Sequence, residues 1–173
     1  MGLLYLLPSA TQEGIVMEYR KRALDSGDRV IHGGNGLECY DDYSKWVMHC
    51  ERLRNMADIE EETPPSTTFL VIDEETGAMV GIANIRHKLT PYMFQRGGHI
   101  GYSVDANHRK KGYATEILDY CLDFLRNRGE KKILITCYSE NEASRRTIIN
   151  GGGILENEVF MENRYNERYW VEL

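Results

Sequence analysis

The sequence predicts a single α/β domain with a mixed sheet, spanning residues 1–173. Strand-like and helix-like hydrophobic periods alternate along the chain, which is the first observation behind this prediction. A short turn joins two strand candidates as a hairpin, whereas helices separate others as crossovers, so strands of both directions are expected. The expected order is β-α-α-β-β-β-α-β-α-β-β, and a chain of this length can bury a core of its own.

The first strand and helix are predicted from the apolar run at residues 2–7 and the polar residues after Pro8. The run fits a short buried strand. Ser9 and Gln12 stand at the spacing of a capping box, in which two side chains satisfy free amides at a helix start. The helix is therefore expected to extend to about Leu24.

The second predicted helix follows a glycine-rich loop at residues 28–40. Asp41 and Asp42 suit the positive end of its dipole. Acidic residues and two prolines at 60–65 end it. Its apolar face recurs at three- and four-residue spacings, at Tyr43, Trp46, Val47, Cys50, Leu53 and Ala57.

Three strand candidates come next. Residues 67–72 and 79–85 are β-rich runs joined by a short polar turn, which predicts a hairpin. A loop around Pro91 separates this hairpin from the third candidate, residues 99–104.

The C-terminal third begins with a strongly amphipathic helix over residues 112–129. The apolar run at 132–138 predicts a buried strand. Ser139 and Glu142, again at capping-box spacing, are expected to open a short helix. Two strands around a turn near residues 163–166 complete the predicted domain.

The charge balance is acidic, with 21 Lys and Arg against 27 Asp and Glu and a net charge of −6. Because phosphate backbones require a basic protein face, this balance argues against nucleic acid as a partner. It favours a cationic amine as a substrate. No apolar run approaches the roughly 20 residues of a membrane-spanning helix, so no membrane partner is expected.

The cysteines and histidines show no metal-ligand spacing. Four cysteines are widely separated without a CxxC pair, and five histidines are equally scattered. No metal is therefore predicted. Since the opening residues do not read as an export leader, we expect reduced thiols and a cytoplasmic location.

The segment at residues 104–114 carries the most chemical information, because it places three consecutive cations at the start of the amphipathic helix. The free amides of a helix N-terminus, beside the missing side chain of Gly112, form an anion site. Cations are disfavoured at this end of a helix, so Arg109, Lys110 and Lys111 indicate a phosphate ligand. The alternative is a basic turn on a solvated surface.

This segment contains neither the P-loop nor the dinucleotide-binding pattern. Arg109-x-x-Gly112-x-Ala114 instead resembles the Q/R-x-x-G-x-G/A motif of the GNAT superfamily of N-acetyltransferases, which holds the pyrophosphate of acetyl-CoA. Residues Asn141 to Ser144 resemble the second motif of that family, and the element order is similar over nearly the whole chain. The resemblance is nearest to bacterial predicted acetyltransferases of unassigned substrate, and it implies the GNAT acyl-CoA N-acyltransferase fold.

The resemblance also implies which residues bind acetyl-CoA. Backbone groups of Tyr102, Ser103 and Val104 would meet the pantetheine amides, and Asn141 and Ser144 would lie beside the pantetheine arm. The pyrophosphate would be surrounded by Arg109, Lys110, Lys111, Gly112, Tyr113, Ala114 and Thr115.

The catalytic base and acid depart from the family pattern. The strand positions that often hold a Glu or His base are Gly98 and Ile100 here, neither of which titrates. His99, between them, and Tyr102 remain candidates, although a histidine on a strand is more often structural. The usual acid, a tyrosine on the short helix, is replaced by Ile148, and Tyr138 is the candidate substitute. A base acting through water, or an amine that arrives deprotonated, is the alternative.

The resulting hypothesis is an acetyl-CoA-dependent N-acetyltransferase that acts on a primary amine by direct attack in a ternary complex. The missing base and acid motivate a second hypothesis, a CoA-binding sensor or structural module without catalysis. Transfer of a longer acyl group is a third. Family analogy leaves a homodimer, paired through the C-terminal strands, as an open possibility.

Overall fold

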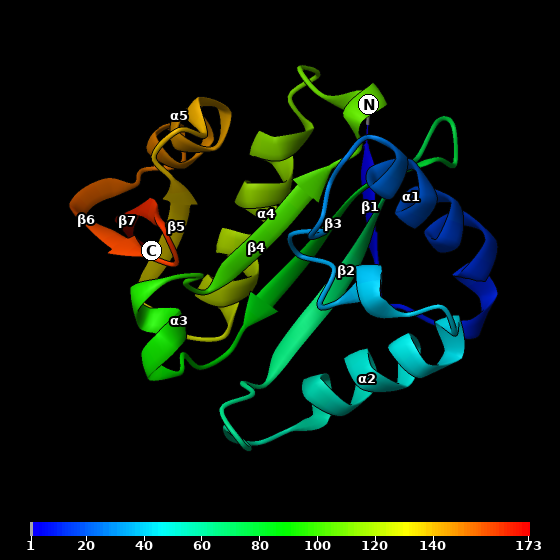
Figure 1. Cartoon of the computed structure of the whole chain (residues 1–173), viewed down its shortest axis with the longest axis horizontal. Helices are drawn as coiled ribbons and strands as arrows, with labels where there is room; N and C mark the ends of the chain where they lie inside the picture. Colours follow the sequence, from blue (N-terminus) through cyan, green and yellow to red (C-terminus); the bar gives the residue numbers. More distant parts are fainter. Residues whose placement is uncertain (1) are drawn as a thin grey trace.

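The computed structural model describes residues 2–173, and its element order agrees with the prediction (Figure 1). The strands are β1 (Leu3–Leu6), β2 (Ser66–Asp73), β3 (Met79–Arg86), β4 (Ile100–Val104), β5 (Lys132–Tyr138), β6 (Ile154–Met161) and β7 (Arg164–Glu172). The helices are α1 (Glu13–Asp25), α2 (Tyr43–Asn55), α3 (Pro91–Gln95), α4 (Tyr113–Asn127) and α5 (Glu142–Asn150).

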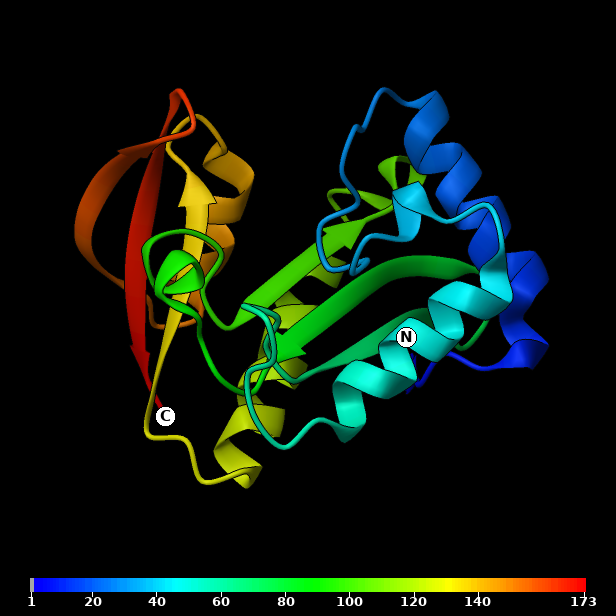
Figure 2. The ribbon, with the colours of Figure 1, turned by 60° about the horizontal axis from the view of Figure 1, so that its bottom comes forward.

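The strands form two antiparallel sheets rather than one mixed sheet. The first has the order β1-β2-β3-β4, and the second has the order β5-β7-β6. The crossover through α4 therefore joins two sheets, because β4 and β5 do not pair along their lengths. Figure 2 shows these two strands diverging, with the second sheet standing apart from the first.

Successive side chains of a strand point to opposite faces of the sheet, so the first sheet separates two hydrophobic cores. Leu70 and Ile72 point toward α1 and α2 on one face. Phe69 and Val71, the alternate residues of the same strand, point toward α4 on the other face. The core around α4 also contains Ile135 and other residues of the second sheet, so α4 is packed against both sheets.

Three local predictions need correction. The capping side chain of α5 is Asn141, not Ser139, and its Oδ1 accepts the amide of Ser144 at 3.1 Å. The last hairpin turns at Glu162 and Asn163, both with positive φ, as a two-residue turn requires. The loop around Pro91 contains α3, which the Thr90 side chain caps by accepting the amide of Met93.

The two sheets meet at the residues just before β4. Gly98 forms an isolated bridge with Ile135, and the amide of His99 donates to the carbonyl of Leu134 at 2.8 Å. The Nδ1 atom of His99 in turn accepts the amide of Leu134 at 2.9 Å. Gly98 has φ +61°, and a Cβ atom there would lie 2.4 Å from the Leu134 carbonyl oxygen. Only glycine allows this approach.

We expect Gly98→Ala to destabilise the protein more than Gly77→Ala. Gly77 also has a positive φ, of 69°, but nothing lies within 4 Å of a Cβ atom there. The backbone conformation alone costs about 1–2 kcal/mol for an L-residue. The clash at Gly98 adds about 1–3 kcal/mol. Urea unfolding of both variants measures the difference, and equal losses would contradict a close approach at the junction.

Candidate active site

A cleft of about 250 Å³ opens between β4 and β5, where the two sheets diverge. It is the meeting point of the loop before α2, the end of β3, α3, the two strands and the start of α5. Its lining residues are His32, Gly33, Arg86, Tyr92, Met93, Arg96, Gly97, Ile100, Gly101, Tyr102, Thr136, Cys137, Tyr138, Asn141, Ser144 and Asn166.

The edge of β4 that faces this cleft carries free main-chain groups. Two hydrogen bonds, from the Arg86 amide to the His99 carbonyl and from the Asp105 amide to the Val80 carbonyl, set the register between β3 and β4. In this register the N–H and C=O groups of Tyr102 point away from β3 and toward β5. A ligand with amide groups can therefore pair with β4 as an additional strand would.

The start of α4, where the sequence predicts an anion site, has an open backbone. Gly112 is the N-terminal cap, with φ +87°, and no side chain caps the helix. Nothing lies within 4 Å of a Cβ atom at Gly112, so the backbone there is open to a ligand. Lys110 and Lys111 are exposed, and neither forms an ion pair with another residue of the range 2–173.

The turn before α4 is fixed by contacts that the sequence analysis did not identify. Asp105 is buried and pairs with Arg22 of α1, whose Nε lies 2.6 Å from Oδ2. Burial alone would raise the pKa of Asp105, but hydrogen bonds from the Asn107 amide and Arg22 hold it below its usual value. Arg109 Nε donates to the carbonyl of Val104 at 3.2 Å.

The side chains of the remaining α4 residues predicted to bind acetyl-CoA differ in whether they face the protein or the solvent. The hydroxyl of Tyr113 donates to the buried Asp73 at 2.7 Å, so its side chain faces the protein and only its backbone is available to an anion. Thr115 is exposed, and Ala114 is half-buried. Their amides belong to the first turn of α4, the end that favours negative charge.

Tyr102 and Ser103 extend to opposite sides of β4. Ser103 Oγ lies 3.0 Å from the hydroxyl of Tyr19 on α1. The hydroxyl of Tyr102 is buried and makes no well-formed hydrogen bond within residues 2–173, although Ser144 and Thr147 lie nearby. Burial raises its pKa. An unpartnered polar atom of this kind, beside a cleft, is available to a ligand.

The candidate base His99 does not line the cleft. Its ring is half-buried at the junction of the sheets, where Nδ1 accepts the Leu134 amide. Burial lowers its pKa. The physical reason for its position is the bridge at Gly98, which directs the His99 ring toward the second sheet rather than into the cleft.

A different histidine, His32, lines the cleft together with Tyr138. Their ring centroids lie 6.2 Å apart in an edge-on arrangement. Desolvation lowers the pKa of His32, and Arg96 and Arg86 also lower it, whereas Glu38 and Asp28 raise it. The glycine-rich loop of His32 is anchored, because the indole of Trp46 donates to the carbonyl of Gly34 at 2.9 Å.

Tyr138 lies between two guanidinium groups at the end of β5. Arg96 Nη2 donates to its hydroxyl, and Arg164 lies over its ring at 3.6 Å from the centroid. Since the Tyr138 oxygen accepts from Arg96, its own proton is free to be donated into the cleft. Ile148, which replaces the family tyrosine, is fully buried in the core.

The thiol of Cys137 is the nucleophilic group in the cleft lining, and it is held protonated. Burial raises its pKa to about 12, with the Glu167 carboxylate as the next cause. All four cysteines are free thiols, as expected.

Within residues 2–173, no group of three His, Cys, Asp or Glu side chains is arranged to hold a metal ion. No helix in that range has the length and hydrophobicity to cross a bilayer.

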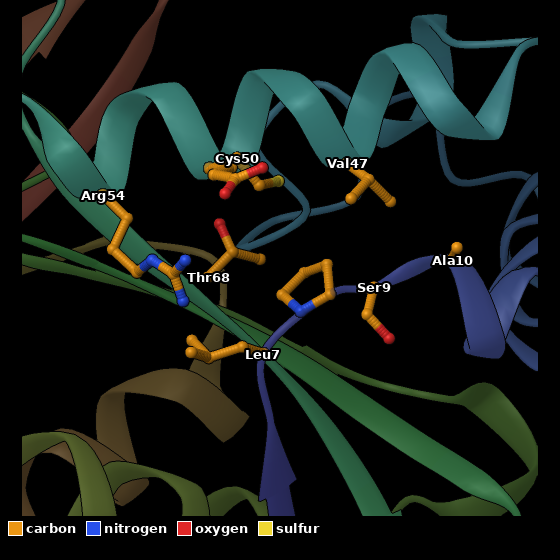
Figure 3. Close-up of a pocket in the computed structure, with 9 residues that line it drawn as sticks. Leu7, Ser9, Ala10, Val47, Cys50, Arg54 and Thr68 are labelled. Carbon is orange, nitrogen blue, oxygen red and sulfur yellow. The ribbon is translucent and has the colours of Figure 1, made fainter.

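A second cavity, of about 400 Å³, lies between α2 and the chain after β1 (Figure 3). Leu7, Ser9, Val47, Arg54 and Thr68 are among its lining residues. None of the motif residues at 104–115 or 141–144 contributes to it. The larger volume therefore does not make it the candidate active site.

The sequence matches the model of the Acetyltransferase (GNAT) family over residues 36–148, more than half of the chain. This range includes the free edge of β4, the start of α4 and the cap of α5. The chain therefore belongs to the GNAT acetyltransferase family. A comparison with curated protein sequences finds no match.

Solved structures share the fold at low sequence identity. A ribosomal-protein-S5-alanine acetyltransferase from Vibrio fischeri has a TM-score of 0.74 and 16% identity, covering 99% of this chain and 93% of that one. Mutant forms of the spermidine/spermine N-acetyltransferase from Vibrio cholerae have a TM-score of 0.66 and 13% identity, covering 98% of this chain and 93% of that one. A ribosomal L7/L12 α-N-protein acetyltransferase in complex with coenzyme A has a TM-score of 0.70 and 14% identity, covering 99% of this chain and 94% of that one.

Proposed function

We propose that this acetyltransferase binds acetyl-CoA between β4 and β5 and transfers the acetyl group to a primary amine by direct attack in a ternary complex. The observation that carries the proposal is the cleft itself, which brings β4 together with His32, Tyr138 and the cap of α5. The uncapped start of α4 follows β4 in the chain. Similar folds include acetyltransferases whose names give a polyamine or a ribosomal protein as the substrate.

The residues present fit acetyl-CoA at both ends of the cofactor. The open backbone at Gly112, with the two unpaired lysines before it, suits a pyrophosphate. The free groups of Tyr102 on β4 and the Nδ2 atom of Asn141, whose Oδ1 already caps α5, suit the amides of a pantetheine arm. When bound, acetyl-CoA supplies an activated acyl group.

His32 is the proposed base, in place of His99. The attacking amine must lose a proton, and a neutral imidazole in the cleft can accept it directly or through water. The lowered pKa of His32 keeps the ring neutral at pH 7. Tyr138 is the proposed acid, because its hydroxyl proton is not used by Arg96.

The cleft does not require a covalent enzyme intermediate. The high pKa of Cys137 leaves almost no thiolate at neutral pH, so direct attack by the amine is favoured over transfer through this thiol. The free edge of β4 also offers N–H donors for negative charge that develops during the reaction.

The binding proposal is tested by titrating the protein with acetyl-CoA and following its thermal unfolding. At 100 times the dissociation constant, a ligand stabilises a protein by about 2.7 kcal/mol. We expect Gly112→Glu to weaken binding at least about tenfold, since it adds a carboxylate where the pyrophosphate lies.

Gly129→Glu is the matched control, because Gly129 follows the other end of α4, has φ +91° and also has open space around a Cβ atom. Equal weakening in both variants would contradict the proposed pyrophosphate site. Binding without release of free CoA in the presence of any amine would support the sensor hypothesis instead.

The base is tested by the pH dependence of kcat/KM. A base acts when deprotonated, so kcat/KM is expected to fall on the acidic side of a pKa below about 6.5, the usual histidine value. His32→Gln should lower kcat/KM about 100-fold and remove this acidic limb.

His99→Ala separates the two histidines. It leaves the Leu134 amide without its acceptor and is expected to cost about 1–3 kcal/mol of stability. The folded His99→Ala protein should still show the fall of kcat/KM at acidic pH. Loss of the limb in His99→Ala but not in His32→Gln would return the role of base to His99.

A homodimer remains part of the proposal, and the edge strand β6 supports it. Ile154, Leu155 and Phe160 are exposed on this strand, and Tyr165 is exposed on β7. An unpaired, apolar edge favours pairing with a second copy. Sedimentation equilibrium is expected to give about twice the chain mass, and a monomer at every concentration would contradict this. The cytoplasmic location also stays a prediction, supported by the free thiols.

A further inference from the structure

Arg86 occupies an unusual position at the end of β3. Its side chain lines the cleft, and its Nη1 atom donates to the carbonyls of Gly97 and Gly98 at 3.3 and 2.9 Å. These two bonds fix the guanidinium beside the junction of the sheets. The Nε and Nη2 atoms form no hydrogen bond with the described residues and are not sealed from the cleft.

No carboxylate of residues 2–173 pairs with Arg86. Burial alone lowers its pKa to about 10, with no neighbouring acid to oppose the effect. The residues that line the cleft include no Asp or Glu at all. The charge of the half-buried Arg86 is therefore uncompensated by the described residues.

The carboxylates around the cleft are already used elsewhere. Glu162 pairs with Arg96 and accepts the hydroxyl of Tyr92. Glu167 pairs with Arg145 at 2.8 Å. Glu38 accepts the amide of Ile31 at 3.3 Å.

The acidic residues just before α2 are likewise occupied. Asp41 pairs with Arg20, and Asp42 caps α2 by accepting the amide of Ser44. Neither lines the cleft. The cleft lining therefore carries no carboxylate, although the net charge of the chain is negative.

A partly desolvated cation without a counter-ion is costly in a protein. A guanidinium also presents its donors in a planar fork, which matches the oxygens of a carboxylate or phosphate. The free Nε and Nη2 atoms of Arg86 are adjacent members of that fork. A ligand anion in the cleft would supply the missing charge and accept both donors.

We propose that the amine acceptor carries a carboxylate or phosphate group, which binds to Arg86 in the cleft. This inference rests on the proposed acetyl transfer and adds the class of acceptor. Arg96 lies on the same lining but is already paired with Glu162, so Arg86 is the lining arginine that lacks a counter-ion. An acceptor of this class is zwitterionic, with its amine near His32 and its anionic group near Arg86.

Matched pairs of amines test the proposal in the unmodified protein. Lysine and cadaverine, or histidine and histamine, differ by a carboxylate, while phosphoethanolamine and ethanolamine differ by a phosphate. With saturating acetyl-CoA, we expect the anionic member of at least one pair to have a kcat/KM about 10- to 100-fold higher. The carboxylate and phosphate pairs distinguish the two anions.

Variants of Arg86 supply the second arm. Arg86→Gln should abolish the preference within the favoured pair, and Arg86→Lys should restore part of it. Arg146→Gln, on the exposed face of α5, is the control and should keep the full preference. Thermal unfolding and acetyl-CoA titration verify that each variant is folded.

Equilibrium binding gives a readout that does not depend on turnover. Calorimetry with both members of each pair is expected to show tighter binding of the member that carries the carboxylate or phosphate. Equal affinity within every pair, or a preference that Arg86→Gln leaves intact, overturns the proposal. Failure to bind acetyl-CoA would instead overturn the proposed function, so the two failures are distinguishable.

Discussion

The active-site geometry depends on one short set of main-chain contacts, the junction between Gly98 and Leu134–Ile135. At this point the two sheets are bonded to each other, and beyond it their edge strands separate. The junction closes one end of the cleft and leaves the groups of Tyr102 free along the other. A regular ladder between β4 and β5 would satisfy those groups and remove the binding site, so incomplete pairing is a requirement of the function.

Packing, rather than hydrogen bonding, keeps the two sheets together away from the junction. The amphipathic face of α4 shares one core with Ile85 of the first sheet and Ile133 of the second. The N-terminus of the same helix, which no side chain caps, is the proposed phosphate site. The apolar face of α4 and the amides of its first turn belong to one rigid element, so core packing also positions the proposed anion site.

The sequence predicts those features of the fold and of the candidate site that depend on neighbouring residues, but not those that depend on contacts between distant residues. The helix and strand order follows from the period of the hydrophobic residues, which is a local signal. The proposed anion site also rests on a local signal, the three cations before Gly112. The division into two sheets is not local, since it depends on an approach at Gly98 that only distant residues create. His32 and Arg86 were not predicted to line the cleft for the same reason, because a loop and a strand end bring them there only in the folded chain.

The cleft is assembled from two sets of chain segments that have little in common. β4 and the cap of α5 line the proposed cofactor side, whereas the loop of His32, α3 and the end of β3 line the proposed acceptor side. Substitutions in the second set would change the charge and shape of the proposed acceptor side without altering the start of α4, the proposed phosphate site. Such a division allows acceptor specificity to diverge among related proteins without loss of the shared acyl donor.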